Sequence, residues 1–368
     1  MTLLLSVILV ALVFEYINGF HDTANSIATV VSTKVLTPRM AILLAAFTNL
    51  VGALYGTAVA KTISSGLLEQ TLIPKEFGQS YLICALFGAI VWNLVTWWFG
   101  LPSSSSHALI GGLVGAGLAA AHNNIGVIIF AKAKAGVPWF KYEGLLYKVV
   151  IPMFLSPILG LIVGMLTITL LYILLQKASP GFVSRFFGRG QLLSAAYMGF
   201  SHGSNDAQKT MGIIALSLVA GIKSGAVAEL PSWLSFMQHP MMKDASGAEG
   251  IATWIKVTCA LVMAAGTAAG GWKIIKTMGH KMVRLQPVDG FAAETTAATV
   301  LSIAGHFGMP VSTTHAITTS IMGVGCAKRA GALNMEVVQR ILWAWILTIP
   351  STALIGYAAM RFWIGLGQ

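Results

Sequence analysis

The sequence predicts an all-α membrane protein that crosses the bilayer about ten times. We expect two inverted-topology repeats with broken or re-entrant helices at the midplane of the membrane. Two observations lead to this fold class. First, 56% of the residues are hydrophobic, only 10% are charged and the mean hydropathy is +0.78, so one or two soluble cores cannot bury the apolar surface. Second, the polar motifs of the first half return in the same order in the second half.

Apolar runs long enough to span a membrane recur along the chain, since about 20 helical residues cross roughly 30 Å of hydrocarbon. The long runs are centred on residues 2–20, 40–60, 80–99, 146–176, 191–221, 251–272 and 337–360. Shorter or interrupted runs cover residues 103–130, 290–307 and 310–327. The first run lacks the basic start and the small-residue cleavage site of a signal peptide, so we expect it to be retained as the first helix.

The charge and the cysteines argue against two classes of soluble protein. The chain has 23 Lys and Arg against 12 Asp and Glu, a formal net charge of +11. In a soluble domain this excess favours nucleic acid as a partner. Here most basic residues lie between apolar runs, where they set membrane topology, so we expect no nucleic-acid partner. The three cysteines lie in apolar runs without paired spacing, which indicates neither disulfides nor a metal cluster.

Two polar motifs occur twice, in the same order. The stretch GFHDTANS, which holds Asp22 and Asn25, aligns with GSNDAQKT, which holds Asp206 and Lys209. The stretch GLPSSSSHA, which begins at Gly100, aligns in the same way with GMPVSTTHA in the second half. We interpret the chain as an internal duplication. The predicted parts are a first repeat at 1–178, a cytoplasmic linker at 179–190 and a second repeat at 191–368.

The charge pattern predicts that the two repeats face opposite sides of the membrane. Residues 61–78 hold two Lys and two Glu, whereas the equivalent loop at 271–290 holds three Lys and one Arg against one Asp. Because basic loops stay in the cytoplasm, equivalent loops are expected on opposite sides. We therefore expect a multi-pass protein of the cell (inner) membrane with both termini outside. Substrates of inverted repeats bind near the midplane, which points to a transporter.

The proline and hydroxyl motifs predict an anion site. Pro102 and Pro310 interrupt apolar runs, so a new helix is expected to begin after each proline. The N–H groups at a helix start lack intrahelical acceptors and lie at the positive end of the helix dipole, which favours a small oxyanion. The hydroxyl residues expected to add donors there are Ser104, Ser105, Ser106, Ser312, Thr313 and Thr314. The alternative is that these hydroxyls only cap buried helix ends.

Two acidic residues in apolar surroundings predict a cation site. A carboxylate at the centre of a membrane helix costs about 2.5–3.5 kcal/mol, so Asp22 and Asp206 require compensation. Asn25 and Lys209 each follow three residues later on the same helix face. Together with hydroxyls and unwound carbonyls, these oxygens suit Na⁺, or the carboxylates take protons instead. Lys209 either contacts the anion or pairs with Asp206. The glycines expected to unwind the helices are Gly19, Gly199 and Gly203.

Three further polar residues have open roles. Glu294 lies in an apolar run without an acidic counterpart in the first half, so it is a candidate coupling carboxylate. The alternative for Glu294 is a hydrogen bond with a neighbouring Thr. His107 and His315 follow the hydroxyl runs, as in a hydrolase or a zinc site, but the chain has neither a His-Glu-x-x-His nor a Gly-x-Ser-x-Gly motif. We expect these histidines to stabilise helices, and the protein not to be an enzyme.

The motifs resemble the two signature regions of the inorganic phosphate transporter (PiT) family, especially its bacterial members. The resemblance is carried by NGFHDTANSIATVVSTKVLTP, GFSHGSNDAQKTMGIIALSL, GLPSSSSHALIGG and GMPVSTTHAITT, and it extends over nearly the whole chain. It implies an inverted repeat and secondary uptake of inorganic phosphate coupled to Na⁺ or H⁺. The family's Asn-Asp-x-Ala-Asn signature maps onto 21–25 and 205–209. His21 replaces the first Asn, and Gln208 and Lys209 replace the second Ala-Asn.

The leading hypothesis is Na⁺-coupled phosphate import by alternating access, with no cofactor besides the coupling ion. The residues expected to bind phosphate are Asn25, Ser104, Ser105, Ser106, Gln208, Lys209, Ser312, Thr313 and Thr314, and those expected to bind sodium are Asp22, Asn25, Asn205 and Asp206. The expected partners are phosphate, Na⁺ and the lipid bilayer, and a homodimer is left open. The alternatives are coupling to H⁺, a metal-phosphate or sulfate substrate, a passive anion channel, and an intramembrane Ser/His hydrolase.

Overall fold

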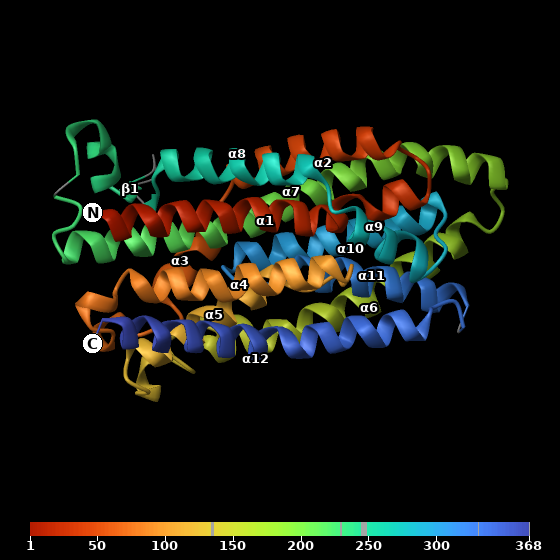
Figure 1. Cartoon of the computed structure of the whole chain (residues 1–368). Coiled ribbons are helices and arrows are strands. Elements are labelled where there is room, and N and C mark those ends of the chain that lie inside the picture. Colours follow the sequence, from red (N-terminus) through yellow and green to blue (C-terminus); the bar gives the residue numbers. More distant parts are fainter. Residues whose placement is uncertain (134–135, 229, 244–248, 330, 368) are drawn as a thin grey trace.

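The computed structural model is an elongated bundle in which long helices lie side by side (Figure 1). It describes residues 1–133, 136–228, 230–243, 249–329 and 331–367. The α-helices are α1 (Thr2–Ser32), α2 (Pro38–Ala53), α3 (Ala58–Ser65), α4 (Ser80–Trp98), α5 (Ser105–Ala120), α6 (Ile151–Leu175), α7 (Pro180–Lys223), α8 (Thr253–Ala269), α9 (Trp272–Lys276), α10 (Pro287–His306), α11 (Thr313–Lys328) and α12 (Met335–Leu366).

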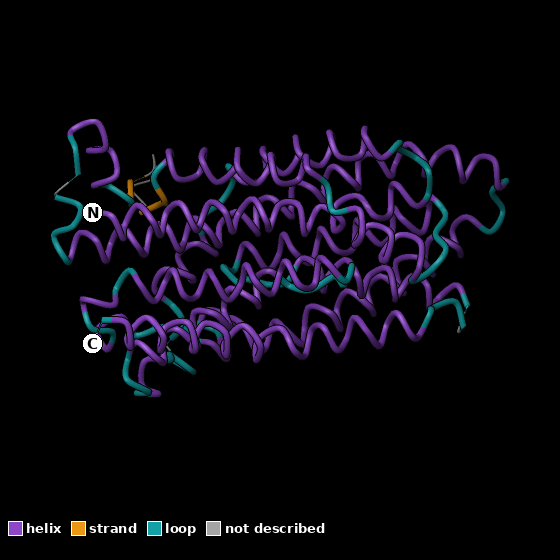
Figure 2. Tube along the Cα trace, viewed as in Figure 1, coloured by secondary structure: helices purple, strands orange, loops and turns teal. Residues whose placement is uncertain are grey.

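Short elements complete the described fold, which is almost entirely helical (Figure 2). The 3₁₀-helices are η1 (Gln70–Leu72), η2 (Lys75–Phe77), η3 (Ile125–Val127), η4 (Trp139–Lys141) and η6 (Ser232–Gln238), and the π-helices are η5 (Leu146–Val150) and η7 (Thr277–Lys281). Strands β1 (Met241–Lys243) and β2 (Glu249–Ile251) pair antiparallel, with Met241 opposite Ile251.

Helix length and composition agree with a multi-pass membrane protein. Within the described residues, four helical segments are long and apolar enough to cross a bilayer. They are Thr2–Ser32, Lys75–Trp98, Leu146–Leu175 and Met335–Leu366. The count reaches six if two bent pairs each form one span, namely α2 with α3, bent by 70°, and α8 with the helical stretch Trp272–Lys281, bent by 60°. The expected ten passes therefore stay a prediction.

The chain breaks and restarts at both proline motifs. After α4 ends, α5 begins at Ser105, and after α10 ends, α11 begins at Thr313. Each start has a serine N-cap. The Ser104 hydroxyl accepts a hydrogen bond from the backbone N–H of His107 at 3.2 Å, and the Ser312 hydroxyl accepts one from that of His315 at 3.1 Å. The prolines thus mark helix starts, as the sequence predicts.

Helices from the two halves of the chain pack against each other. α5 contacts α12, and its counterpart α11 contacts α6; α2 contacts α7, and α8 contacts α1. Glycines allow the close approach of α5 to α12 and of α11 to α6. A Cβ atom on Gly115 would overlap the carbonyl oxygen of Ala353, and one on Gly323 would overlap that of Leu161. Each half therefore completes its packing on the other half.

The predicted unwinding at three glycines is wrong, because α1 and α7 run through them as unbroken helices. A Cβ on Gly19 would lie 2.5 Å from the carbonyl oxygen of Met263, and one on Gly203 would overlap that of Asn49. A Cβ on Gly199 would overlap a threonine hydroxyl of α2. These glycines remove side chains so that α8 and α2 can approach closely.

The segment expected as a linker is helical. α7 begins at Pro180, after the N-cap Ser179, and continues through 179–190 into the second half without a break. α7 has 44 residues, and its first part extends beyond the other helices at the end of the bundle opposite the termini (Figure 1). Both termini lie at one end of the bundle (Figure 1).

Among the described residues, the core consists of two apolar clusters separated by polar side chains. Along α1, the first cluster takes residues from Leu4 to Phe14, and the second takes residues from Ala24 to Val30. Along α7, the second cluster ends at Met198 and the first resumes at Ala207. The buried polar residues between these stretches include Glu15, Asn18, His21, Asp22, His202, Asn205 and Asp206. Both long helices therefore carry their polar residues midway along the bundle.

Candidate functional site

The buried polar layer meets the first turns of α5 and α11 and forms what we call the central polar cluster. Its contacts are made by His21, Asp22, Asn25, Ser105, His202, Asp206, Lys209, Thr313 and Thr314, all at most 3% exposed. Burying this many polar groups is costly unless they pair with one another or with a ligand. The pattern of pairing therefore indicates what the cluster can hold.

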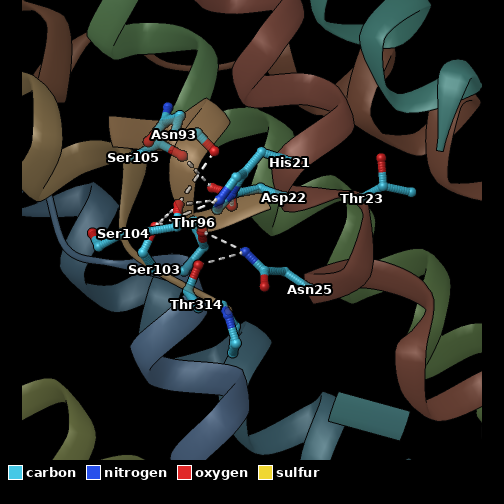
Figure 3. Close-up of polar contacts among 12 residues, drawn as sticks. His21, Asp22, Thr23, Asn25, Asn93, Thr96, Ser103, Ser104, Ser105 and Thr314 are labelled. Carbon is cyan, nitrogen blue, oxygen red and sulfur yellow. Dashed lines mark hydrogen bonds and ion pairs between the residues drawn. The ribbon is translucent and has the colours of Figure 1, made fainter. Parts of the chain in front are cut away.

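On the first-half side, Asp22 has a histidine and a serine as hydrogen-bond partners. His21 Nδ1 lies 2.7 Å from Asp22 Oδ1, and the Ser105 hydroxyl donates to Asp22 Oδ2 at 3.0 Å (Figure 3). An ionised carboxylate only accepts hydrogen bonds, so Nδ1 is the donor of this contact whenever Asp22 is ionised. His21 Nε2 in turn lies 3.1 Å from the hydroxyl of Thr96 on α4. α1, α4 and α5 thus fix the carboxylate of Asp22.

On the second-half side, Asp206 has a charged partner. The Lys209 ammonium, one turn further along α7 and fully buried, donates to Asp206 Oδ1. The other oxygen, Oδ2, accepts from the Thr313 hydroxyl at 3.3 Å and lies 3.5 Å from His202 Nε2. Of the two roles considered for Lys209, the pairing with Asp206 is therefore present.

The two carboxylates come together at the start of α11. Asp22, His202 and Asp206 each offer a ligand atom, and these atoms lie within 4.8 Å of one another. Asn25 reaches across from α1, and its amide donates to the hydroxyls of Thr313 at 3.2 Å and Thr314 at 3.0 Å. The acidic residues of both motifs thus share one buried region with the hydroxyls of the second helix start.

The two helix starts also lie together. The rings of His107 and His315 are 4.8 Å apart between centroids, and the Ser106 hydroxyl donates to the carbonyl oxygen of Val311 at 3.4 Å. The first N–H groups of α5 and α11 have no acceptor within their own helices, so two sets of anion-binding donors converge. Ser104 and Ser312 accept capping bonds there, as the capping alternative predicts, yet each hydroxyl keeps its own proton to donate.

Several buried amides near the carboxylates have no hydrogen-bond partner among the described residues. Both polar side-chain atoms of Asn18, Asn93 and Asn205 are of this kind, and so is the hydroxyl of Ser26. A buried polar group left without a partner costs about 1–3 kcal/mol. Such groups indicate that water or ligands complete the site, and Asn205 is among the residues predicted to bind sodium.

Comparison with known proteins identifies the family. The model of the phosphate transporter family matches residues 18–356. The chain belongs to the phosphate transporter family. It is 38% identical to a probable low-affinity inorganic phosphate transporter of Bacillus subtilis (strain 168), over 96% of this chain and 95% of that protein. It is 41% identical to one of Rhizobium meliloti (strain 1021), over 96% and 94%. The resemblance seen in the sequence is confirmed, and these family members are transporters rather than enzymes.

A solved structure has the same fold. It is titled "The sodium-dependent phosphate transporter", and it matches with a TM-score of 0.80 over 99% of both chains at 23% sequence identity. At this identity the match establishes the fold alone. The helical bundle described above therefore has the fold of that solved structure.

In this family member, Gln208 lies at the edge of the cluster with its polar atoms occupied. Its Oε1 accepts from the backbone N–H groups of Val59 at 2.9 Å and Ala60 at 3.4 Å, at the start of α3. Its Nε2 donates to the carbonyl oxygen of Tyr55 at 3.4 Å. Gln208, predicted to bind phosphate, is thus engaged in holding the bend between α2 and α3.

Glu294 of the transporter forms a second polar group, separate from the central polar cluster. Its carboxylate accepts hydrogen bonds from the hydroxyls of Thr29 and Ser194 and from the amide of Gln191 at 3.2 Å. Glu294 therefore does hydrogen-bond a threonine, but that threonine comes from α1 and is not a neighbour in the sequence; two further partners lie on α7. Thr29 lies seven residues, or about 10 Å of helix, beyond Asp22 on α1.

Sequence reasoning missed some members of both groups. His202 lies four residues before Asp206, a spacing that places both on one helix face and was a usable signal. Gln191 and Ser194 pair with Glu294 across α7 and α10, and nothing in their own sequence neighbourhood indicates this. The sequence marked His21 only as a departure from the family signature, although His21 is the chain neighbour of Asp22 and contacts it directly.

Proposed function

We propose that this chain imports inorganic phosphate together with Na⁺ by alternating access. The observation that carries the proposal is that two helix starts rich in N–H and hydroxyl donors share one buried site with two carboxylates. An anion beside carboxylates is unfavourable unless a cation offsets the charge. Phosphate and Na⁺ would therefore each bind better when the other is bound, which is the coupling that symport requires. The sodium-dependent name of the structural match supports Na⁺.

We propose that phosphate binds at the two helix starts. The hydroxyls of Ser105, Ser106, Thr313 and Thr314 belong to the first turns of α5 and α11, where the helix dipoles favour an anion. Asn25 supports this assignment, because its amide already donates to two of these threonines. Ser104 and Ser312 cap these helices as acceptors, and their hydroxyl protons would donate to the phosphate.

We propose that the coupling cation binds beside the carboxylates. Asp22, the amides of Asn25 and Asn205, and nearby hydroxyls supply the hard oxygen ligands that Na⁺ prefers. The unpartnered oxygen of Asn205 supports this assignment. Asp206, the other predicted ligand, lies in the same cluster but is ion-paired with Lys209. Glu294 is a secondary candidate for coupling, because its carboxylate joins α1, α7 and α10, three helices that would shift during alternating access.

The proposed mechanism uses two inverted repeats at 1–178 and 191–368 that together make ten passes. The reciprocal contacts support it, since α5 on α12 corresponds to α11 on α6, and α2 on α7 to α8 on α1. α1 runs away from the end that holds the termini, whereas α7 runs back towards it (Figure 1).

We propose an orientation in which both termini lie outside the inner membrane. A homodimer stays a prediction.

The test is uptake of ³²P-phosphate into proteoliposomes, with an inward Na⁺ gradient compared against an inward proton gradient at matched membrane potential. The proposal predicts accumulation above equilibrium with Na⁺ alone. Accumulation with protons alone would replace Na⁺ by H⁺ and keep the substrate. Equilibration without accumulation would indicate a channel. Competition by sulfate or by divalent metal would identify those alternative substrates.

A further inference from the structure

The two halves present the same carboxylate with different compensation. The aligned motifs pair Asp22 with Asp206, and both accept a hydroxyl from an equivalent position, Ser105 for Asp22 and Thr313 for Asp206. The residue three positions later differs, because Asn25 in the first half corresponds to Lys209 in the second. The same geometry thus holds a neutral amide on one side and an ammonium on the other.

The Lys209 ammonium is ion-paired with one of the two carboxylates. It is fully buried and ion-paired with Asp206, the carboxylate of its own helix. Asp22 is paired with His21 and Ser105. His21 Nδ1 faces Asp22, and its Nε2 faces the Thr96 hydroxyl. Asp206 therefore has an ammonium partner, and Asp22 has none of its own.

We propose that Lys209 takes the place of one coupling cation, so that the Asp206 side is permanently filled and the transported cation binds beside Asp22. The inference rests on the proposed function as a cation-coupled phosphate transporter. A tethered ammonium neutralises a buried carboxylate as a bound Na⁺ would, but it is not carried across the membrane. Each phosphate would then move with one cation fewer than in a chain that has asparagine at this position.

The direct test replaces Lys209 by the residue of the first half. Lys209→Asn and wild-type protein are reconstituted, and the ratio of ²²Na⁺ to ³²P taken up is measured in the same vesicles. We expect the ratio and the Hill coefficient for Na⁺ to rise by about one in the variant, and its uptake at low Na⁺ to fall. The matched control Lys209→Arg keeps the charge and should keep the wild-type ratio. An unchanged ratio in active Lys209→Asn protein, with weaker phosphate binding, would assign Lys209 to phosphate and overturn the proposal.

If the Lys209→Asn protein does not fold, a second variant tests the same proposal. Lys209→Gln removes the charge with a longer side chain than Asn, and it should show the same rise in the ratio. A wild-type ratio in active Lys209→Gln protein, or a changed ratio in Lys209→Arg, would overturn the proposal. Equilibrium ²²Na⁺ binding to purified protein distinguishes this inference from the proposed function. If wild-type vesicles accumulate no phosphate, the proposed function fails. Lys209→Asn must still bind one more Na⁺ per chain than wild type for this inference to stand.

Discussion

At the residue scale, charge compensation explains how Asp22 and Asp206 are tolerated in an apolar bundle. Each carboxylate has both oxygens in hydrogen bonds or ion pairs, contributed by α1, α5, α7 and α11. A buried carboxylate without an ammonium partner favours binding of a cation, and Asp22 is the better candidate because Lys209 pairs with Asp206 instead. The charge of Asp22 is therefore expected to matter for transport rather than for folding.

Asp22→Asn should remove Na⁺-driven phosphate accumulation while the protein remains folded. The amide keeps the size of the side chain, and its oxygen can still accept from His21 or Ser105, but the negative charge that attracts the cation is lost. We expect uptake driven by Na⁺ to fall at least about tenfold, equivalent to ~1.4 kcal/mol. The exposed carboxylate variant Glu76→Gln serves as the control and should transport normally. Normal Na⁺-driven accumulation by Asp22→Asn would contradict the assignment.

Gln208→Ala should affect stability more than phosphate affinity. Its amide caps the start of α3 through the N–H groups of Val59 and Ala60, and losing a cap of this kind costs about 1 kcal/mol. The melting temperature in detergent should therefore fall, while the phosphate concentration that gives half-maximal uptake should stay within about twofold of wild type. A large rise in that concentration at unchanged stability would instead support the phosphate role predicted from the family signature.

At the element scale, the long helices are held together by close approaches at glycines. Gly19 on α1 faces a carbonyl oxygen of α8, and Gly203 on α7 faces one of α2, so these two equivalent positions serve equivalent contacts. The sequence marked these glycines as special, but glycine has two uses, and local sequence does not distinguish an unwound helix from a crowded one. The packing partner decides, and it lies more than 100 residues away for both.

Gly203→Ala should destabilise the protein, because the new Cβ would overlap the backbone of Asn49 and force α2 away from α7. Overpacking of this kind costs typically about 1–3 kcal/mol. Gly188→Ala on the same helix has nothing within 4 Å and should be neutral or slightly stabilising, because alanine favours helix. Thermal unfolding of the two variants in the same detergent gives the comparison. Equal melting temperatures would mean that the helices do not approach as described.

At the whole-molecule scale, the sequence predicts much of the site because its motifs are duplicated and placed at helix starts and helix middles. The prolines predict where α5 and α11 begin, and the acidic residues predict the polar layer of α1 and α7. The other residues of the site come from contacts across the bundle. Gln191 and Ser194 reach Glu294, and Gln208 caps α3, through tertiary packing that no local pattern encodes.

The two helix starts and the two carboxylates come from different halves of the chain, so one site requires both halves. The central claim is that this shared site binds phosphate and a cation cooperatively. Because coupling free energies are reciprocal, phosphate should bind more tightly with Na⁺, and Na⁺ more tightly with phosphate, by the same factor. A typical coupling of 1–3 kcal/mol corresponds to about 5–150-fold.

The most direct measurement is calorimetric titration of the purified protein with phosphate, in Na⁺ and in a matched salt of a large organic cation, at fixed pH. We predict at least about fivefold tighter phosphate binding in Na⁺. In the Asp22→Asn variant, the advantage of Na⁺ should disappear. Equal phosphate affinity in the two salts for the wild-type protein would contradict the account, because a site whose ligands bind independently cannot couple their transport.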